Sequence, residues 1–244
     1  DLLVGIRGGK FTARLIVDLK DLDELKVLKE DDQGITIGAA VTLNEITAFE
    51  PILKNIPILA QGARSVGSYS IRNRGTLAGN ICNASPAADT AAPLYCIGAS
   101  VIIAGAEDRR AVPVEEFFTG PGQKALKKGE LVYSVLVPKP YPQGKGVYIK
   151  ASRTGSVDLA TVGVAVQKWD DQVKIAVGAV APTPVRALAV EEAVNKKGVR
   201  DWAEAAKLVR ENISPITDLR GSQDYRIHIS EVLVRRGLEQ TMGV

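Results

Sequence analysis

The chain has 244 residues, of which 45% are hydrophobic and 24% charged, a size and composition that suit one or two globular domains. Its formal net charge is only +3, and the basic residues are dispersed, so nothing in the composition indicates a nucleic-acid-binding or membrane-surface protein. No stretch approaches the ~20 consecutive apolar residues of a membrane-spanning helix.

Cysteine and histidine usage excludes further classes. The two cysteines, Cys82 and Cys96, are too few for an iron–sulfur cluster, and they fit reduced thiols of a cytoplasmic protein better than a disulfide framework. The single histidine, His228, lies on a predicted helix. Multi-histidine metal sites and Ser-His-Asp catalysis are therefore poor hypotheses, and we expect His228 to be structural or exposed.

Short elements are predicted in the first fifty residues. The apolar run 15–19 predicts a strand, and the segments 26–29 and 34–41 flank a turn as the two arms of a hairpin would. Thr42 and Glu45 have the spacing of a capping box, in which each residue bonds to the backbone of the other. A helix is therefore predicted to begin directly after Thr42.

Residues 67–89 hold small residues, amides and hydroxyls at a higher density than the rest of the chain, and a helix over 58–66 is predicted to lead into them. This composition predicts a loop that wraps a ligand. Gly75 and Gly79 let the backbone approach a bound group closely, and successive backbone N–H groups in a turn can bind phosphate. Asp89 is placed to accept hydrogen bonds from ribose hydroxyls. The alternative is an ordinary loop rich in Gly, Asn and Ser.

A resemblance to a known family is carried by residues 71–89, which read IRNRGTLAGNICNASPAAD. They resemble the second flavin-binding segment of the FAD subunits of molybdenum hydroxylases, such as carbon monoxide dehydrogenase and xanthine dehydrogenase, with the pattern I-R-N-x-x-T-x-G-G-N-I-x-x-A-S-P-x-x-D. The chain has Ala78 at one glycine of that pattern. Further segments that match the family in order are 150–153, 158–160, 181–186 and 218–226.

The resemblance implies an α+β, two-domain flavoprotein. Its first part, residues 1–140, would be an FAD-binding domain of the vanillyl-alcohol-oxidase-like type. The second part, residues 144–244, would be a small antiparallel sheet with packed helices. The prolines and glycines of 138–146 suit a linker between them. An earlier glycine-rich loop of the family ends at the position of Asp1, so the N-terminal part of the first domain is expected to be missing.

Periodicity predicts the elements that follow the glycine-rich segment. Phe117 and Phe118 precede a Gly-Pro-Gly turn, and we interpret them as core residues, with a position near the flavin as the alternative. The predicted hairpin has arms 99–104 and 110–114, the predicted strands are 130–137, 147–151, 159–169 and 172–180, and the predicted helices are 185–195, 199–212 and 223–241.

The resemblance also implies the residues that hold FAD. Val132 would lie along the cofactor. Lys150 and Asp158 would be the site residues of the C-terminal domain, with Lys150 reaching from its sheet toward the flavin ring; the alternative for Lys150 is a surface lysine at a strand edge. The implied set is Asp1, Leu2, Val66, Arg72, Thr76, Leu77, Ala78, Gly79, Asn80, Asp89, Val132 and Lys150. We expect structural ion pairs or subunit docking, and not catalysis, from Arg153, Arg186, Asp218, Arg220, Tyr225 and Arg226.

The implied function is electron transfer through FAD to an external acceptor. Because two cysteines cannot hold the clusters, 2Fe-2S clusters are expected on a small iron–sulfur partner subunit and the molybdenum cofactor on a large one, in a heterotrimer or its dimer in the cytoplasm. Two alternatives stay open. One is a flavin-free structural adaptor, for which the missing first loop and Ala78 speak, and the other is an unrelated nucleotide-binding module.

Overall fold

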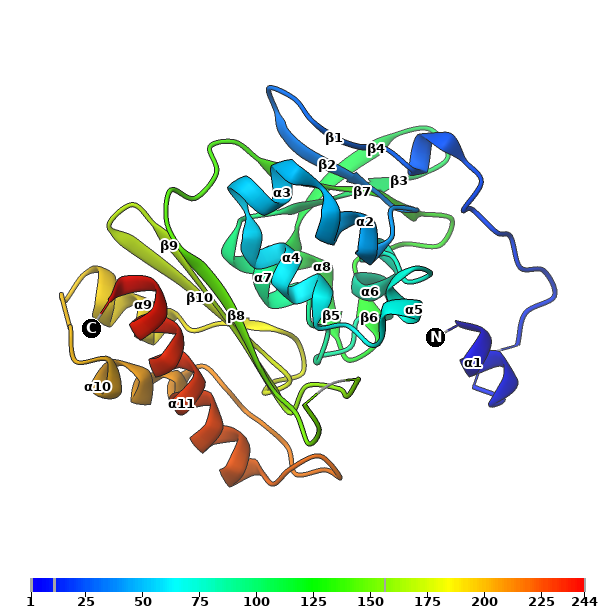
Figure 1. Cartoon of the computed structure of the whole chain (residues 1–244). Coiled ribbons are helices and arrows are strands. Elements are labelled where there is room, and N and C mark those ends of the chain that lie inside the picture. The colour runs from blue at the N-terminus through cyan, green and yellow to red at the C-terminus, as the bar shows by residue number, and fades with distance from the viewer. Residues whose placement is uncertain (1, 11, 156, 244) are drawn as a thin grey trace.

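The computed structural model describes residues 2–10, 12–155 and 157–243. Two sheets with their helices stand side by side in it, one from each half of the chain (Figure 1). The fold therefore combines helices with antiparallel sheets, as the α+β prediction expected. Asp1 lies outside the described residues.

The first half is built on an antiparallel sheet in the order β1-β2-β7-β3-β4. Side chains at every second position, such as Ile35, Ile37 and Val101, are fully buried, because successive residues of a strand point to opposite faces. The strands are β1 Leu28–Glu30, β2 Gly34–Gly38, β3 Ser100–Ala104, β4 Arg109–Pro113 and β7 Leu131–Pro138. Both predicted hairpins and the strand over 130–137 are confirmed.

Short helices cover this sheet. Thr42 caps α2 as predicted: its hydroxyl accepts from the Glu45 N–H, and the Glu45 carboxylate accepts from the Thr42 N–H at 2.7 Å. Phe117 and Phe118 are buried against each other, which confirms that they are core residues. The helices are α2 Leu43–Ala48, α3 Glu50–Asn55, α4 Pro57–Arg64, α5 Tyr69–Arg72, α6 Leu77–Asn83, α7 Ala91–Cys96 and α8 Val114–Phe117, and the ribbon β5 Phe118–Gly120 with β6 Gln123–Lys124 follows them.

Two predictions for the first half are wrong. Residues 15–19 form no strand and are exposed, because no neighbouring strand among the described residues pairs with them; they follow α1 (Leu2–Arg7), which stands apart from the rest of the chain (Figure 1). Residues 67–89 are not one continuous loop. They contain α5 and α6, which begin where the hydroxyls of Ser68 and Thr76 accept hydrogen bonds from the first turn of each helix.

The second half is an antiparallel sheet in the order β11-β10-β9-β8. Its central strand, β9, is buried from Val162 to Gln167 because α11 packs on one side and α7 of the first half lies against it as well. The strands are β8 Gly146–Ala151, β9 Val162–Trp169, β10 Gln172–Gly178 and β11 Val185–Arg186, and the helices are α9 Leu188–Asn195, α10 Trp202–Lys207 and α11 Gln223–Met242.

The structure shortens four predicted elements of this half. The strand expected over 172–180 ends at Gly178. The strand expected from 159 starts at Val162. The helix expected over 185–195 begins only at Leu188, because Val185 and Arg186 pair with β10. The helix expected over 199–212 is α10, capped by Asp201, followed by a 3-10 helix from Leu208 to Glu211. The helix over 223–241 is confirmed as α11, and His228 lies exposed on it.

Ion pairs hold the arginines that the sequence marked as structural, and one of these arginines is buried. Arg226, whose residue is only 1% exposed, donates to Asp218 at 2.6 Å and to the carbonyls of Thr161 and Ala179. Arg220 binds the same carboxylate. These hydrogen bonds keep the pKa of Asp218 well below its usual value, so its negative charge is retained.

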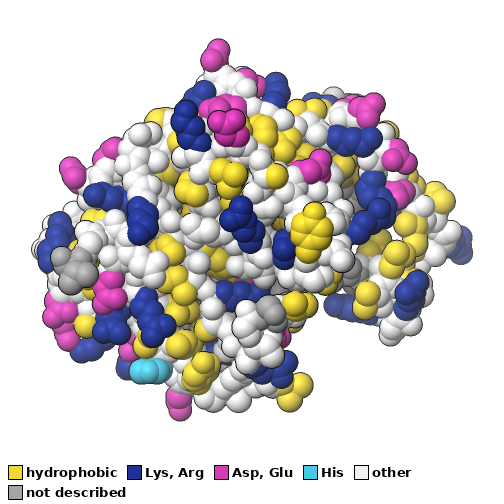
Figure 2. Space-filling view, viewed as in Figure 1, with side chains coloured by type: hydrophobic (Ala, Val, Ile, Leu, Met, Phe, Trp, Pro, Cys, Tyr) yellow, Lys and Arg dark blue, Asp and Glu magenta, His cyan; other side chains and the backbone are white. Residues whose placement is uncertain are grey.

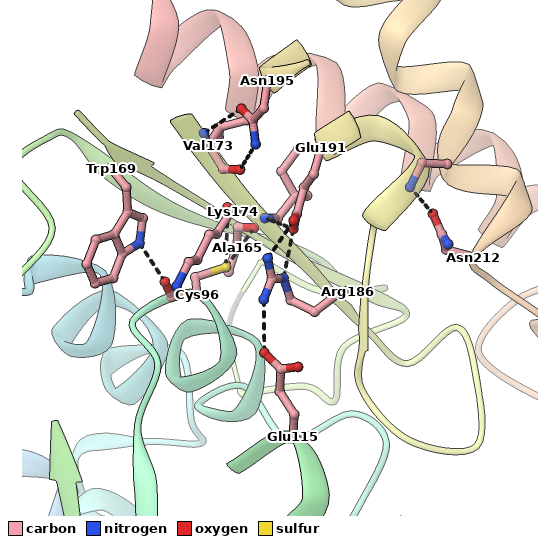
Figure 3. A network of polar contacts seen from close by, with 12 residues as sticks. Cys96, Glu115, Ala165, Trp169, Val173, Lys174, Arg186, Glu191, Asn195 and Asn212 are labelled. Carbon is pink, nitrogen blue, oxygen red and sulfur yellow. Dashed lines mark hydrogen bonds and ion pairs between the residues drawn. The ribbon is translucent and has the colours of Figure 1, made fainter. Parts of the chain in front are cut away.

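A second network joins the two halves (Figure 3). Arg186 of β11 donates to both carboxylate oxygens of Glu191 on α9, and its third nitrogen donates to Glu115 of α8 at 2.9 Å. Glu191 also accepts the N–H of Ile175 at 2.7 Å. Since the Glu191 side chain is only 9% exposed, Arg186 supplies the countercharge that its burial requires.

Substitution Arg186→Met should lower the free energy of unfolding by about 3–5 kcal/mol, because it keeps the stem and leaves the buried Glu191 carboxylate without a countercharge. Urea unfolding measures the loss. The control Lys207→Met removes a surface pair with Glu204 and should leave stability unchanged within error. Equal behaviour of the two variants would contradict the structural role of Arg186.

Candidate functional site

Arg72 forms hydrogen bonds that hold the segment between α4 and α6 in place. Its guanidinium donates to the carbonyls of Val66 and Gly67 at 3.1 Å each and to the Asn44 side chain at 3.2 Å. Two predicted site residues, Val66 and Arg72, are thus in contact with each other. In the described structure their contact is a structural one, since it fixes the path of the backbone before α6.

The first turn of α6 carries the central predicted residues. The Thr76 hydroxyl accepts the N–H of Gly79 at 2.9 Å, while the N–H groups at the first positions of a helix have no acceptor within the helix itself. Gly79 is exposed, and a Cβ there would meet only the Thr76 oxygen within 4 Å. A bound group can therefore approach the backbone at Gly79 closely.

The side chains of Leu77 and Ala78 point into the protein, away from the exposed face of the turn at Gly79. Leu77 is fully buried and Ala78 is 6% exposed, and both belong to the hydrophobic core of the first half. The methyl group that distinguishes Ala78 from the glycine of the family pattern therefore adds to the core. It does not narrow the outer face of the turn.

A shallow pocket of about 210 Å³ opens beside Thr76. Its wall includes three basic residues that the sequence reasoning missed, Lys20, Lys26 and Arg74, and one acidic residue, Glu45. Lys20 and Lys26 also form exposed ion pairs with Asp18 and Asp23. This volume suits a phosphate-sized part of a ligand and not a whole dinucleotide. Arg74 lies about fifty residues after Lys20 and Lys26 in the sequence, so no local pattern could have indicated that it meets them.

Asp89 and Lys150 come from different halves and form a buried ion pair. The Lys150 ammonium donates to Asp89 Oδ2 at 2.9 Å and to the Ser65 carbonyl at 3.0 Å, and the Tyr148 hydroxyl donates to Asp89 Oδ1 at 2.7 Å. Burial raises the pKa of Asp89, while Lys150 and Tyr148 oppose that shift. Lys150 is therefore not an exposed lysine: its side chain is 13% exposed and that of Asp89 is 7% exposed.

The glycine-rich turn and the ion pair are connected. Thr90, next to Asp89, donates its hydroxyl to Asn80 Oδ1 at 2.6 Å, so that α6 is tied to the segment that carries Asp89. The structure thus brings Thr76 to Asn80, Asp89 and Lys150 into one region. Within the described residues, Leu2 stays apart on α1, where it is 55% exposed, and Val132 is buried in β7 opposite Ile103.

Asp158 forms an ion pair with Arg153, in which Arg153 Nε lies 3.5 Å from Asp158 Oδ2. Both cysteines are free; burial raises the pKa of Cys82 to about 11 and raises that of Cys96 as well, so both thiols stay protonated.

In the described ranges, no group of three or more His, Cys, Asp and Glu could hold a metal ion, and no helix is long and apolar enough to cross a membrane. Acidic and basic side chains are interspersed on the face in Figure 2.

Comparison with known families decides what this region belongs to. The family model described as FAD binding domain in molybdopterin dehydrogenase matches residues 1–140, and that of the CO dehydrogenase flavoprotein C-terminal domain matches residues 147–241. The chain belongs to this flavoprotein family of the molybdopterin dehydrogenases. It is accordingly a subunit of an oxidoreductase, as the resemblance implied.

Individual relatives support the same family assignment. The glyceraldehyde dehydrogenase medium chain of Sulfolobus acidocaldarius is 33% identical over 92% of this chain and 82% of its own length. The carbon monoxide dehydrogenase medium chain of Hydrogenophaga pseudoflava is 29% identical over 91% and 80%. A solved carbon monoxide dehydrogenase from that organism superimposes with a TM-score of 0.89 at 28% identity, covering 98% of this chain and 85% of the other. Quinoline 2-oxidoreductase from Pseudomonas putida 86 gives a TM-score of 0.91 at 26% identity, with coverage of 98% and 85%.

The residues present fit the FAD that this family binds. The exposed Gly79 backbone is open to close approach, and three basic residues, against one acidic residue (Glu45), line the pocket beside Thr76, so cations are within reach of an anionic pyrophosphate. A lysine ammonium carries three N–H donors, and two of those of Lys150 are engaged by Ser65 and Asp89, so one is left for a ligand atom.

Replacing Lys150 by Met should destabilise the protein by about 3 kcal/mol, since the buried Asp89 carboxylate then keeps only the Tyr148 donor. The loss should shrink in the double variant with Asp89→Asn, because that variant no longer buries an unpaired charge. Both values come from urea unfolding. Additive losses in the double variant would mean that the two side chains do not form an ion pair in solution.

Proposed function

We propose that this chain is the FAD-binding medium subunit of a molybdenum hydroxylase-type complex that passes electrons from iron–sulfur clusters of a partner subunit to an external acceptor. The observation that carries the proposal is the match of the FAD-binding family model to residues 1–140, which include the open turn at Gly79. When bound, FAD supplies the redox chemistry, and the protein supplies its position and electrostatic surroundings.

Within this function the residues of the chain have separate tasks. The backbone from Thr76 to Asn80, beside the pocket of Lys20, Lys26 and Arg74, binds the pyrophosphate. Lys150 places its remaining N–H and its positive charge near the flavin ring, where the charge favours the reduced, more negative form. Arg72 keeps the backbone before α6 in place. Leu2, Val132 and Asp1 complete the proposed contacts, Asp1 from outside the described residues.

The same proposal divides the chain into an FAD-binding domain of the vanillyl-alcohol-oxidase-like type over residues 1–140 and a C-terminal domain over 144–244. Its partners are a large subunit with the molybdenum cofactor and a small subunit with 2Fe-2S clusters, assembled as a heterotrimer or its dimer. The two free, protonated thiols fit the reducing cytoplasm that we propose as its location.

Substitution Gly79→Val should weaken FAD binding roughly ten- to a hundred-fold, because a branched side chain at the third position of α6 keeps the ligand away from the backbone N–H groups. The measurement is the flavin absorbance per protein after dialysis, on the protein with its subunits. Ala203→Val is the matched control, since it places the same side chain at an exposed position in the first turn of the capped helix α10. Full flavin content in Gly79→Val would exclude this turn as the pyrophosphate site.

Purification from the native host should yield this chain together with a cysteine-rich iron–sulfur subunit and a larger molybdenum-containing subunit. With Cys82 and Cys96 as its only cysteines, the chain cannot hold the clusters that feed its flavin. Metal analysis and intact masses of the co-purifying chains measure this. A chain that purifies alone, without iron or molybdenum, and is fully active would contradict the subunit assignment, whereas a colourless complex would favour the flavin-free adaptor.

A further inference from the structure

Tyr148 stands out at the junction because neither the sequence motif nor the family comparison assigns it a role. It lies on β8, two residues before Lys150, so both side chains point to the same face of the sheet. Its hydroxyl donates to Asp89 Oδ1 at 2.7 Å. Burial, together with the neighbouring Asp89 carboxylate, raises the pKa of the Tyr148 hydroxyl well above its usual value, so this group remains a donor.

The neighbouring strand β9 leaves space for the Tyr148 side chain. Gly163 of β9 lies opposite Lys150, and a Cβ on Gly163 would come within 2.4 Å of the Tyr148 hydroxyl and 3.2 Å of its ring. The missing side chain at Gly163 therefore provides the space that the phenol fills. The Tyr148 backbone is held too, because its N–H donates to the Gln61 side chain of α4 at 2.8 Å.

The Asp89 carboxylate is held by protein donors and is hardly accessible to a ligand. Each of its oxygens accepts one strong donor from β8, and the residue is only 5% exposed. A direct hydrogen bond to a ribose hydroxyl, which the sequence suggested, would require this arrangement to open. Within the described residues, the Lys150 ammonium uses two of its three N–H donors on Ser65 and Asp89, so the donor that remains for a ligand is on Lys150.

We infer that Tyr148 is a positioning residue of the flavin site: its hydroxyl orients the Asp89 carboxylate, and this carboxylate holds the Lys150 ammonium in place against the Ser65 carbonyl. Asp89 then acts on the ligand through Lys150. This inference rests on the proposed function, because it assumes that Lys150 contacts FAD. Tyr148 itself need not touch the ligand.

A double-mutant cycle tests the inference in the complete complex. Tyr148→Phe keeps the ring and should raise the FAD dissociation constant roughly three- to ten-fold, since one oriented hydrogen bond is lost, and it should make the flavin midpoint potential more negative. In the Lys150→Met background the same substitution should change neither quantity further. A purely structural tyrosine would act equally in both backgrounds.

Two further variants make the result specific. Gly163→Ala should reproduce the effect of Tyr148→Phe, because the added methyl displaces the hydroxyl from Asp89. Tyr95→Phe is the control: Tyr95 of α7 is also buried, but its ring packs against Phe118 of β5. Additive effects of Tyr148→Phe and Lys150→Met, or identical FAD binding by Tyr148→Phe and Tyr95→Phe, would overturn the inference.

A measurement without flavin separates this inference from the proposed function. In the same protein stripped of FAD, NMR of ¹³C-labelled lysine, assigned with Lys150→Met, should show that Tyr148→Phe shifts the Lys150 signal and Tyr95→Phe does not. A shifted signal, in a protein that purifies without FAD and does not bind added FAD, would support the contact of Tyr148, Asp89 and Lys150 and refute the proposed function. An unshifted signal would refute the positioning role of Tyr148 whether or not FAD binds.

Discussion

The contact between α4 and β8 brings the two halves of the chain together beside the glycine-rich segment. β8 is an edge strand, whose outer backbone groups need partners, and the Gln61 side chain supplies an acceptor for the Tyr148 N–H. On its other side α4 approaches the segment of Asp89 closely at Gly62, where a Cβ would lie 2.8 Å from the Asp89 carbonyl oxygen. This close packing places Asp89 within reach of Lys150.

Buried charges then define how the halves meet. Among the described residues, two such groups lie at the junction: Asp89 with Lys150, and Arg186 between the buried Glu191 and the partly exposed Glu115. Removal from water offsets much of the Coulomb attraction in a buried pair, so its main effect is on geometry, because a charge in this environment tolerates only the arrangement that keeps its partner. The two pairs therefore fix the orientation of the second sheet against the helices of the first half.

The proposed flavin site uses both sides of this junction. The turn of α6 offers an exposed backbone at Gly79, and the second half contributes the Lys150 ammonium. The bond from Thr90 to Asn80 ties the turn to the residue after Asp89. A displacement at the junction is thus transmitted to the groups that we assign to pyrophosphate and ring, which explains why a residue such as Tyr148, away from the motif, can matter for binding.

The sequence alone determined what depends on near neighbours. The capping box at Thr42, the hairpins and the helix over 223–241 were all predicted, because hydrogen bonds and periodicity within a few residues specify them. The family was predicted from the resemblance of residues 71–89, and the family model confirms it. The tertiary structure decided the rest. Residues 15–19 have no pairing strand in the part of the chain that the structure describes, Val185 and Arg186 form a strand because β10 is available, and Lys150 meets Asp89 across 61 residues. Strand pairing and burial of charge depend on partners that are distant in the sequence, and only the folded chain brings these together.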